Sequence, residues 1–274
     1  MTDDLRYFEA VAHRALAHRS KRSAEEADVR RKITRVKLAA RVPTPPTNLV
    51  TLAKHLKVAA IRHVPLAMKA RLVLGTGGIN VEINTELSEF ERQLALAHEL
   101  AHVILEGPRI ELCAALGQGI RAPSAWARTR IEQLCDLAAA ELLLPLSWLR
   151  DKFRKHVPSL SLARTISEDS HCDVDFLLAH ALDAGLWRCR LLWIERHGQD
   201  FVALRTHPEV EESFLSSLRV TDEPTTLFLQ RVSDDGPNVA AGTLTLSSKD
   251  GKQNYRVECT ALRPGSILCV LIHE

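Results

Sequence analysis

The chain contains the run Leu94-Ala95-Leu96-Ala97-His98-Glu99-Leu100-Ala101-His102-Val103-Ile104-Leu105, which is apolar, lacks glycine and proline, and still holds three ionisable side chains. This composition predicts a buried helix. His98 and His102 are four residues apart, close to one helical turn, so both imidazoles project from one face and can bind a single zinc ion. Glu99 follows the first histidine and can act on a metal-bound water.

The alternative interpretation is that the H-E-x-x-H pentapeptide is a chance match without a metal. A chance match usually falls on a solvated helix, whereas these ionisable residues interrupt a stretch that otherwise belongs to a core. A buried charge without a partner is costly, so a helix that keeps such residues inside supplies them with a metal or with partners. We therefore favour the metal-binding interpretation.

Two histidines leave one protein ligand to be found, and a second helix offers it. Residues 124–144 begin with Ser124, a residue suited to an N-cap, and continue without glycine or proline up to Pro145. Within this mostly apolar helix, Glu132 is the candidate for the third metal ligand.

Asp136 lies one turn beyond Glu132 on the same face of this helix. Zinc-bound histidines usually donate their other ring N–H to a carboxylate, so Asp136 is expected to orient one histidine rather than to bind the metal. In the alternative interpretation, both carboxylates pair on a solvated face with neighbouring arginines, Arg128 and Arg130.

The two helices resemble those of the ImmA/IrrE family of metallopeptidases, in which an H-E-x-x-H helix is followed by a helix that ends in a leucine-rich turn and proline. The second stretch reads Glu132-Gln133-Leu134-Cys135-Asp136-Leu137-Ala138-Ala139-Ala140-Glu141-Leu142-Leu143-Leu144-Pro145. The resemblance extends over about residues 45–185, since 46–56 resemble a short family helix and 77–84 a family strand. Cys135 stands where the family usually has alanine, and a buried free cysteine usually acts as a small hydrophobe.

The resemblance implies one zinc ion per chain, bound by His98, His102 and Glu132, with Glu99 as the catalytic base. It implies an α+β fold in which a zincin-like metallopeptidase domain, mostly helical with a small twisted β-sheet, precedes a β-rich C-terminal domain. It also implies a cytosolic endopeptidase of narrow specificity that cleaves a helix-turn-helix transcriptional repressor and so switches on stress-response or mobile-element genes. The alternative is a non-catalytic zinc-fold binding module or sensor that sequesters a regulatory partner through the β-rich domain.

Residues 79–84 alternate apolar and polar side chains, as an edge or half-buried strand does. Such a strand can bind an extended substrate by adding it to the sheet. A structural hairpin closed by residues 75–78 is the equally open alternative. The donor that stabilises the oxyanion is expected to be a histidine, and the candidates are His156, His171 and His180. In the alternative interpretation, each of these histidines has an ordinary polar or capping role.

Composition limits the remaining functions. The formal net charge is +2, which gives no overall signal for nucleic acid, so direct nucleic-acid binding is not expected. The six cysteines include no C-x-x-C pair, residues 1–4 do not start a signal peptide, and no apolar run reaches the length of a membrane span. We expect a cytoplasmic protein with reduced thiols and no membrane partner.

The sequence suggests three regions. Residues 1–41 form a basic helical arm, which either touches phosphates or, as we favour, packs through apolar residues such as Val29 and Ile33. Residues 42–185 form the metallopeptidase domain. Residues 186–274 form the β-rich domain, whose six expected strands are 186–195, 201–205, 226–232, 239–246, 255–260 and 267–273.

Overall fold

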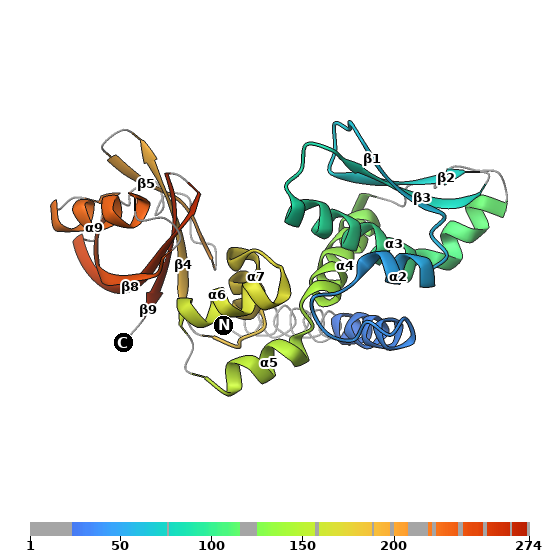
Figure 1. The fold of residues 1–274 in the computed structure, drawn as a ribbon, viewed down its shortest axis with the longest axis horizontal. Helices are drawn as coiled ribbons and strands as arrows, with labels where there is room; N and C mark the ends of the chain where they lie inside the picture. The colour runs from blue at the N-terminus through green and yellow to red at the C-terminus, as the bar shows by residue number, and fades with distance from the viewer. Residues whose placement is uncertain are drawn as a thin grey trace, which may run out of the picture. The chain divides into compact units, whose positions relative to one another are not determined.

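The computed structural model describes residues 24–75, 77–115, 125–156, 159–187, 189–197, 200–207, 219–220, 223–234, 238–248, 251–263 and 265–272. The contacts within the chain divide it into two compact units, Met1–Pro145 and Leu146–Glu274. The first unit combines helices with a small sheet, and the second contains short helices and a curled β-sheet (Figure 1). The expected α+β class with a β-rich C-terminal region is confirmed.

The sheet of the first unit has three strands: β1 (Ala60–Val64), β2 (Ala70–Gly75) and β3 (Gly78–Asn84). Their order is β1-β3-β2, with β3 parallel to β1 and antiparallel to β2. Both backbone edges of β3 are therefore paired. The idea that an extended substrate adds to residues 79–84 is wrong for this reason, whereas the alternative of a β2–β3 hairpin is confirmed.

The first unit also contains four helices: residues 24–39, α2 (Leu49–His55), α3 (Glu89–Ala115) and α4 (Ala125–Leu143). Helix α3 packs on β2 and β3, and α2 and α4 pack on α3. Helix α3 begins at a capping box. The Ser88 hydroxyl accepts from the Glu91 N–H at 3.3 Å, and the Glu91 carboxylate accepts from the Ser88 N–H at 2.9 Å, which lowers the pKa of Glu91. Helix α3 continues beyond Leu105, where the apolar run in the sequence ends.

The helix at residues 24–39 packs on the rest of the first unit. The sequence favours this packing for the basic arm, of which residues 1–23 lie outside the described residues. Val29 and Ile33 are buried, and so is Lys37, whose side chain follows Ile33 by one turn. The Lys37 ammonium donates to the Leu142 carbonyl at 2.7 Å and to the Thr47 hydroxyl at 2.9 Å. A cation thus satisfies a carbonyl in the last turn of α4, where the helix dipole favours positive charge.

Replacing Lys37 with methionine is expected to lower the free energy of unfolding by about 1.5–3 kcal/mol, because the buried Leu142 carbonyl and the half-buried Thr47 hydroxyl lose a charged donor. Urea unfolding followed by circular dichroism measures the change. Lys32→Met is the matched control, since Lys32 is exposed on the same helix and its replacement should cost less than about 0.5 kcal/mol. Equal effects of the two substitutions would contradict the role given to Lys37.

The second unit begins with three helices: α5 (Leu146–Arg154), α6 (Leu160–Ser170) and α7 (Val174–Asp183). Six strands then form a closed barrel in the order β4-β5-β6-β7-β8-β9: β4 (Arg190–His197), β5 (Asp200–His207), β6 (Arg219–Val220), β7 (Ala240–Ser248), β8 (Gly251–Arg263) and β9 (Ser266–Ile272). Antiparallel pairing of β9 with β4 closes it. Helix α6 is fixed to β8, since the Leu160 N–H donates to the Glu258 carboxylate at 2.5 Å.

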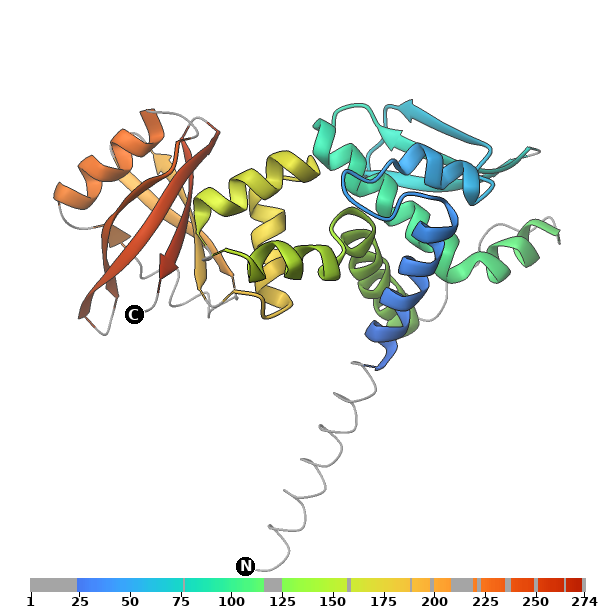
Figure 2. The ribbon, with the colours of Figure 1, turned by 60° about the horizontal axis from the view of Figure 1, so that its bottom comes forward.

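One expected strand of the C-terminal region is wrong. Residues 226–232 lie in helix α9 (Glu223–Asp234), which packs on the barrel (Figure 2). Thr225, Leu229 and Val232 are buried at spacings of four and three residues, which is the period of a helix and not of a strand. The buried face of α9 joins the barrel core, which includes Leu192 and Val257.

The contacts place α5, α6 and α7 in the second unit, whereas the sequence grouped residues 146–185 with the metal helices. The functional division at residues 41 and 185 stays a prediction. None of the helices within the described ranges is both long and apolar enough to cross a membrane.

Candidate metal centre

The site lies on two neighbouring helices of the first unit. Helix α3 carries His98, Glu99 and His102, and helix α4 carries Glu132 and Asp136. Both helices are anchored through apolar residues that are fully buried. These are Ala97, Leu100 and Ala101 on α3, and Cys135, Ala138 and Leu142 on α4. The two helices pack on each other, so the pairing of motifs expected from the sequence is present in space.

Three donor atoms form a nearly equilateral triangle. The two Nε2 atoms of His98 and His102 lie 3.2 Å apart, and the Glu132 Oε2 atom lies 3.2 Å from the first and 3.5 Å from the second. Ligand atoms about 2.05 Å from a tetrahedral zinc ion are about 3.3 Å from one another. The three residues therefore have the spacing of three corners of a zinc tetrahedron, and they could hold a metal ion.

Asp136 accepts a hydrogen bond from one histidine of the triangle. Its Oδ1 atom lies 2.9 Å from His98 Nδ1. An ionised carboxylate can only accept, so Nδ1 carries the proton and the Nε2 lone pair of His98 points to the centre of the triangle. This hydrogen bond also raises the pKa of His98, against the opposing effect of burial. The expected orienting role of Asp136 agrees with this geometry.

Glu106 accepts a hydrogen bond from the second histidine, as Asp136 does from the first. We did not predict this contact from the sequence. Its Oε2 atom lies 2.7 Å from His102 Nδ1, and its side chain is largely buried. The available signal was the spacing, since residues 102 and 106 are one helical turn apart on α3. With both Nδ1 protons held by carboxylates, two imidazole lone pairs and a carboxylate oxygen converge. The two lone pairs and the carboxylate charge repel one another unless a cation lies among them.

Glu99 is 9% exposed, although it follows His98 directly on α3. Burial is the main cause that raises its pKa, and the charge of Glu132 adds to the increase, while the two histidines oppose it. A carboxyl group whose pKa is raised toward neutrality is a better proton acceptor and donor near pH 7 than an exposed one. The residue expected to act as the base is therefore in an environment that suits proton transfer.

The interpretation in which arginines neutralise Glu132 and Asp136 is not supported at Arg130. Its guanidinium instead donates to Glu25 at 2.8 and 3.0 Å. The Arg128 side chain lies outside the described residues.

Other candidate residues have local structural roles. Cys135 is fully buried on α4, and burial raises the pKa of its thiol strongly, so it stays protonated. His171 caps α6 in the left-handed conformation, and His180 is buried on α7 with its ring stacked on Phe176. Both histidines belong to the second unit, and their assignment as oxyanion donors stays a prediction.

Replacing Asp136 with asparagine is expected to weaken metal binding by about 10–100-fold, because the amide accepts less strongly from His98 and leaves its imidazole less basic. Competition with a chromogenic chelator measures the dissociation constant. Gln133→Ala is the control, since Gln133 is exposed on the same helix and should leave the constant unchanged. An unchanged constant in Asp136→Asn would contradict the orienting role.

Two packed helices that bring an H-E-x-x-H pentapeptide and a glutamate to one point form a candidate metal site of the kind found in zincin-like domains. Residues 62–170 match the family model Peptidase M78, described as the IrrE N-terminal-like domain. The matched segment contains both metal helices. Residues 62–170 thus form an IrrE N-terminal-like domain of the Peptidase M78 family, and the resemblance drawn from the two motifs is confirmed. This family associates the chain with metallopeptidases and regulators of the IrrE type.

A solved structure with a TM-score above 0.5 gives a likeness of fold. A Mycobacterium tuberculosis transcriptional regulator matches with a TM-score of 0.53 and 13% identity, over 89% of this chain and 75% of that chain. A domain of the sensory box sensor histidine kinase/response regulator from Geobacter sulfurreducens matches with a TM-score of 0.24 and 13% identity, over 36% of this chain and 96% of that chain. No curated protein matches the sequence.

Proposed function

We propose that the chain is a zinc-dependent endopeptidase of narrow specificity, with His98, His102 and Glu132 as the zinc ligands. The observation that carries this proposal is the donor triangle with edges of 3.2, 3.2 and 3.5 Å. A zinc ion held by only three protein ligands would have room for water or substrate, as in catalytic rather than structural zinc sites. Nitrogen and carboxylate oxygen donors without thiolate also match the ligand sets of zinc hydrolases.

Glu99 is the group that moves the proton in this proposal. A zinc ion held by these three residues would supply Lewis acidity toward a water and the scissile carbonyl. Glu99 would accept the proton of the attacking water and deliver it to the leaving amine, and its raised pKa suits both roles. Asp136 and Glu106 keep the two imidazoles in the tautomer that this arrangement needs.

The proposed substrate is a helix-turn-helix transcriptional repressor, whose cleavage would switch on stress-response or mobile-element genes. This part follows from the resemblance to the ImmA/IrrE family and is consistent with the regulator-like fold match. We also propose that the protein works in the cytoplasm, which agrees with the free thiols of the five described cysteines.

The second candidate function is a binding module that uses the same fold without catalysis and holds a regulatory partner through the second unit. The observation that favours it is the size of the barrel unit, which contributes nothing to the donor triangle. The buried Glu99 argues for hydrolysis, because a scaffold has no physical need for a costly carboxylate beside its metal.

The test is incubation of purified helix-turn-helix repressors, beginning with any encoded next to this gene, with the purified full chain, followed by mass spectrometry of the products. We expect a single cut that is abolished by 1,10-phenanthroline and restored by added zinc. The isomer 1,7-phenanthroline, which does not chelate, is the matched control and should leave cleavage intact. Stable binding of the repressor without any cut would favour the binding module over the peptidase.

A further inference from the structure

Two cysteines of the barrel lie directly opposite each other on adjacent strands. Cys259 of β8 is paired with Cys269 of β9 in the antiparallel register. Both are free thiols, both are fully buried, and both belong to the barrel core. Opposite residues of an antiparallel pair have Cα atoms about 4.5–5.5 Å apart, which lies within the range that a disulfide requires. The register therefore permits a disulfide without displacement of either strand.

The two side chains approach each other closely. The Sγ atom of Cys259 lies 2.8 Å from the Sγ atom of Cys269. Nonbonded carbon atoms pack best about 3.5–4.0 Å apart, and sulfur is larger than carbon. The next pair on the same face of the two strands, Val257 with Leu271, is buried and apolar. Two cysteines that served only as small hydrophobes would not need this approach, which instead suits the formation of a bond between them.

Burial determines when these thiols can react. Burial, and then the hydrogen bond to Cys269, raise the pKa of the Cys259 thiol well above its usual value. A protonated thiol is a poor nucleophile, so the pair is inert while the barrel is closed. Local opening of the hairpin formed by β8 and β9 would bring the sulfurs into contact with water and with small oxidants. The pair is therefore suited to slow oxidation, in contrast to an exposed catalytic thiol.

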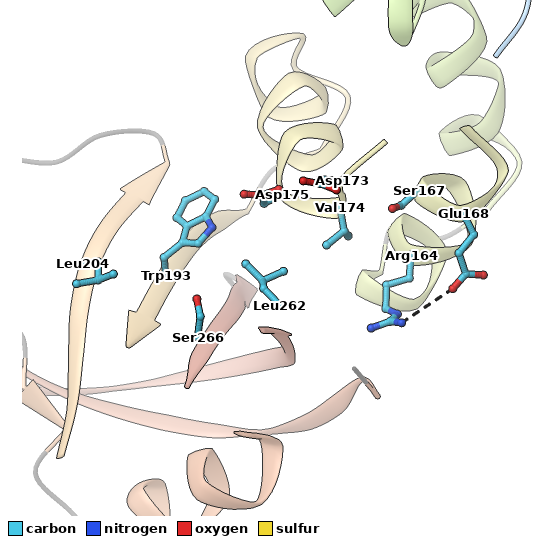
Figure 3. Close-up of a pocket in the computed structure, with 10 residues that line it drawn as sticks. All are labelled: Arg164, Ser167, Glu168, Asp173, Val174, Asp175, Trp193, Leu204, Leu262 and Ser266. Carbon is cyan, nitrogen blue, oxygen red and sulfur yellow. Dashed lines mark ion pairs between the residues drawn. The ribbon is translucent and has the colours of Figure 1, made fainter. Parts of the chain in front are cut away.

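The same part of β8 holds helix α6. Since Cys259 points into the core, its neighbours Glu258 and Thr260 point to the other face of the strand. There the Glu258 carboxylate accepts from the Leu160 N–H at 2.5 Å, and the Thr260 hydroxyl accepts from Arg164 at 2.9 Å. Figure 3 shows Arg164 reaching from α6 toward the barrel strands. A covalent bond at Cys259 would thus fix the segment of β8 on which α6 is anchored.

We propose that Cys259 and Cys269 are a redox-sensitive dithiol, which hydrogen peroxide converts into a disulfide between β8 and β9. One sulfur loses its proton and attacks a peroxide oxygen, so the O–O bond breaks and a sulfenic acid and hydroxide form. The second sulfur, also deprotonated, attacks the first and displaces hydroxide. The two hydroxides take up the two thiol protons and leave as water. The two thiols together lose two electrons, which the peroxide gains, and this reaction is independent of the proposed peptidase activity.

The experiment is treatment of the purified full chain with hydrogen peroxide, followed by unfolding, alkylation of the remaining thiols and tryptic digestion. Residues 257–274 form one tryptic peptide that contains both cysteines, because the bond between Arg263 and Pro264 resists trypsin. We expect this peptide to escape alkylation and to lose the mass of two hydrogen atoms, and a reductant should reverse both effects. The peptide 165–188 is the internal control, since its buried Cys172 should still be alkylated.

Oxidation should also raise the melting temperature of the barrel unit by roughly 5–10 °C, because a disulfide restricts the unfolded chain. Circular dichroism measures this shift, which Cys269→Ala should abolish and Cys172→Ala should retain. Three results would overturn the proposal: alkylation of both cysteines after peroxide, addition of oxygen to them without loss of hydrogen, or a disulfide from either one to another cysteine. If Cys269→Ala does not fold, the mass of the wild-type peptide decides alone.

Discussion

Replacing Glu99 with glutamine is expected to leave zinc bound and to lower the rate of repressor cleavage by about 10²–10⁴-fold, the usual contribution of a positioned general base. Glutamine keeps the size of the side chain but cannot accept the proton of water at neutral pH. Because the amide has no charge to bury, the substitution should also leave the protein at least as stable as the wild type.

The measurement is a single-turnover cleavage assay at matched zinc content. Glu86→Gln is the matched control, since Glu86 is exposed in the loop before α3 and the same change there should keep the wild-type rate. Wild-type cleavage in Glu99→Gln would remove Glu99 from the chemistry without affecting the assignment of the metal ligands.

Replacing Glu132 with alanine is the second large expected effect. It removes one corner of the donor triangle and leaves the two imidazoles without their anionic partner. Zinc content after dialysis should fall from about one ion per chain to near zero. His98→Ala and His102→Ala should have the same result, since each also leaves only two protein ligands.

Zinc content is measured by mass spectrometry of the metal, with the Gln133→Ala variant as a control on the same helix. Loss of zinc should also lower the melting temperature of the wild-type protein toward that of Glu132→Ala, because ligand binding stabilises only the folded state. Full retention of zinc in all three ligand variants would show that the metal binds elsewhere.

The grouping of His98, His102 and Glu132 could be predicted because the pattern is local and periodic. Two histidines one turn apart identify a helix face, and a zinc ion with two histidine ligands requires a third, for which Glu132 on the next apolar helix is suited. Glu106 was not predicted, because the sequence motif draws attention to the second helix, whereas the partner of His102 lies one turn further along α3 itself.

The fold class could be predicted from the sequence, but the pairing of the β-strands could not. The alternation in residues 79–84 correctly indicated a strand, but alternation does not tell an edge strand from a central one, and β3 is paired on both sides. Closure of the barrel depends on pairing between β4 and β9, which are far apart in the chain. The sequence predicts a strand where α9 lies, because Leu227, Phe228 and Leu229 form a short apolar run that fits either period.

The central claim is that His98, His102 and Glu132 bind one zinc ion, and X-ray absorption at the zinc edge of the purified full chain tests it most directly. We expect two imidazole nitrogens, with oxygen as the remaining ligands, all at about 2.0–2.2 Å. A sulfur ligand at about 2.3 Å would make Cys135 or another cysteine a ligand and would contradict the assignment. A spectrum of six-coordinate zinc without imidazole scattering would contradict the claim entirely.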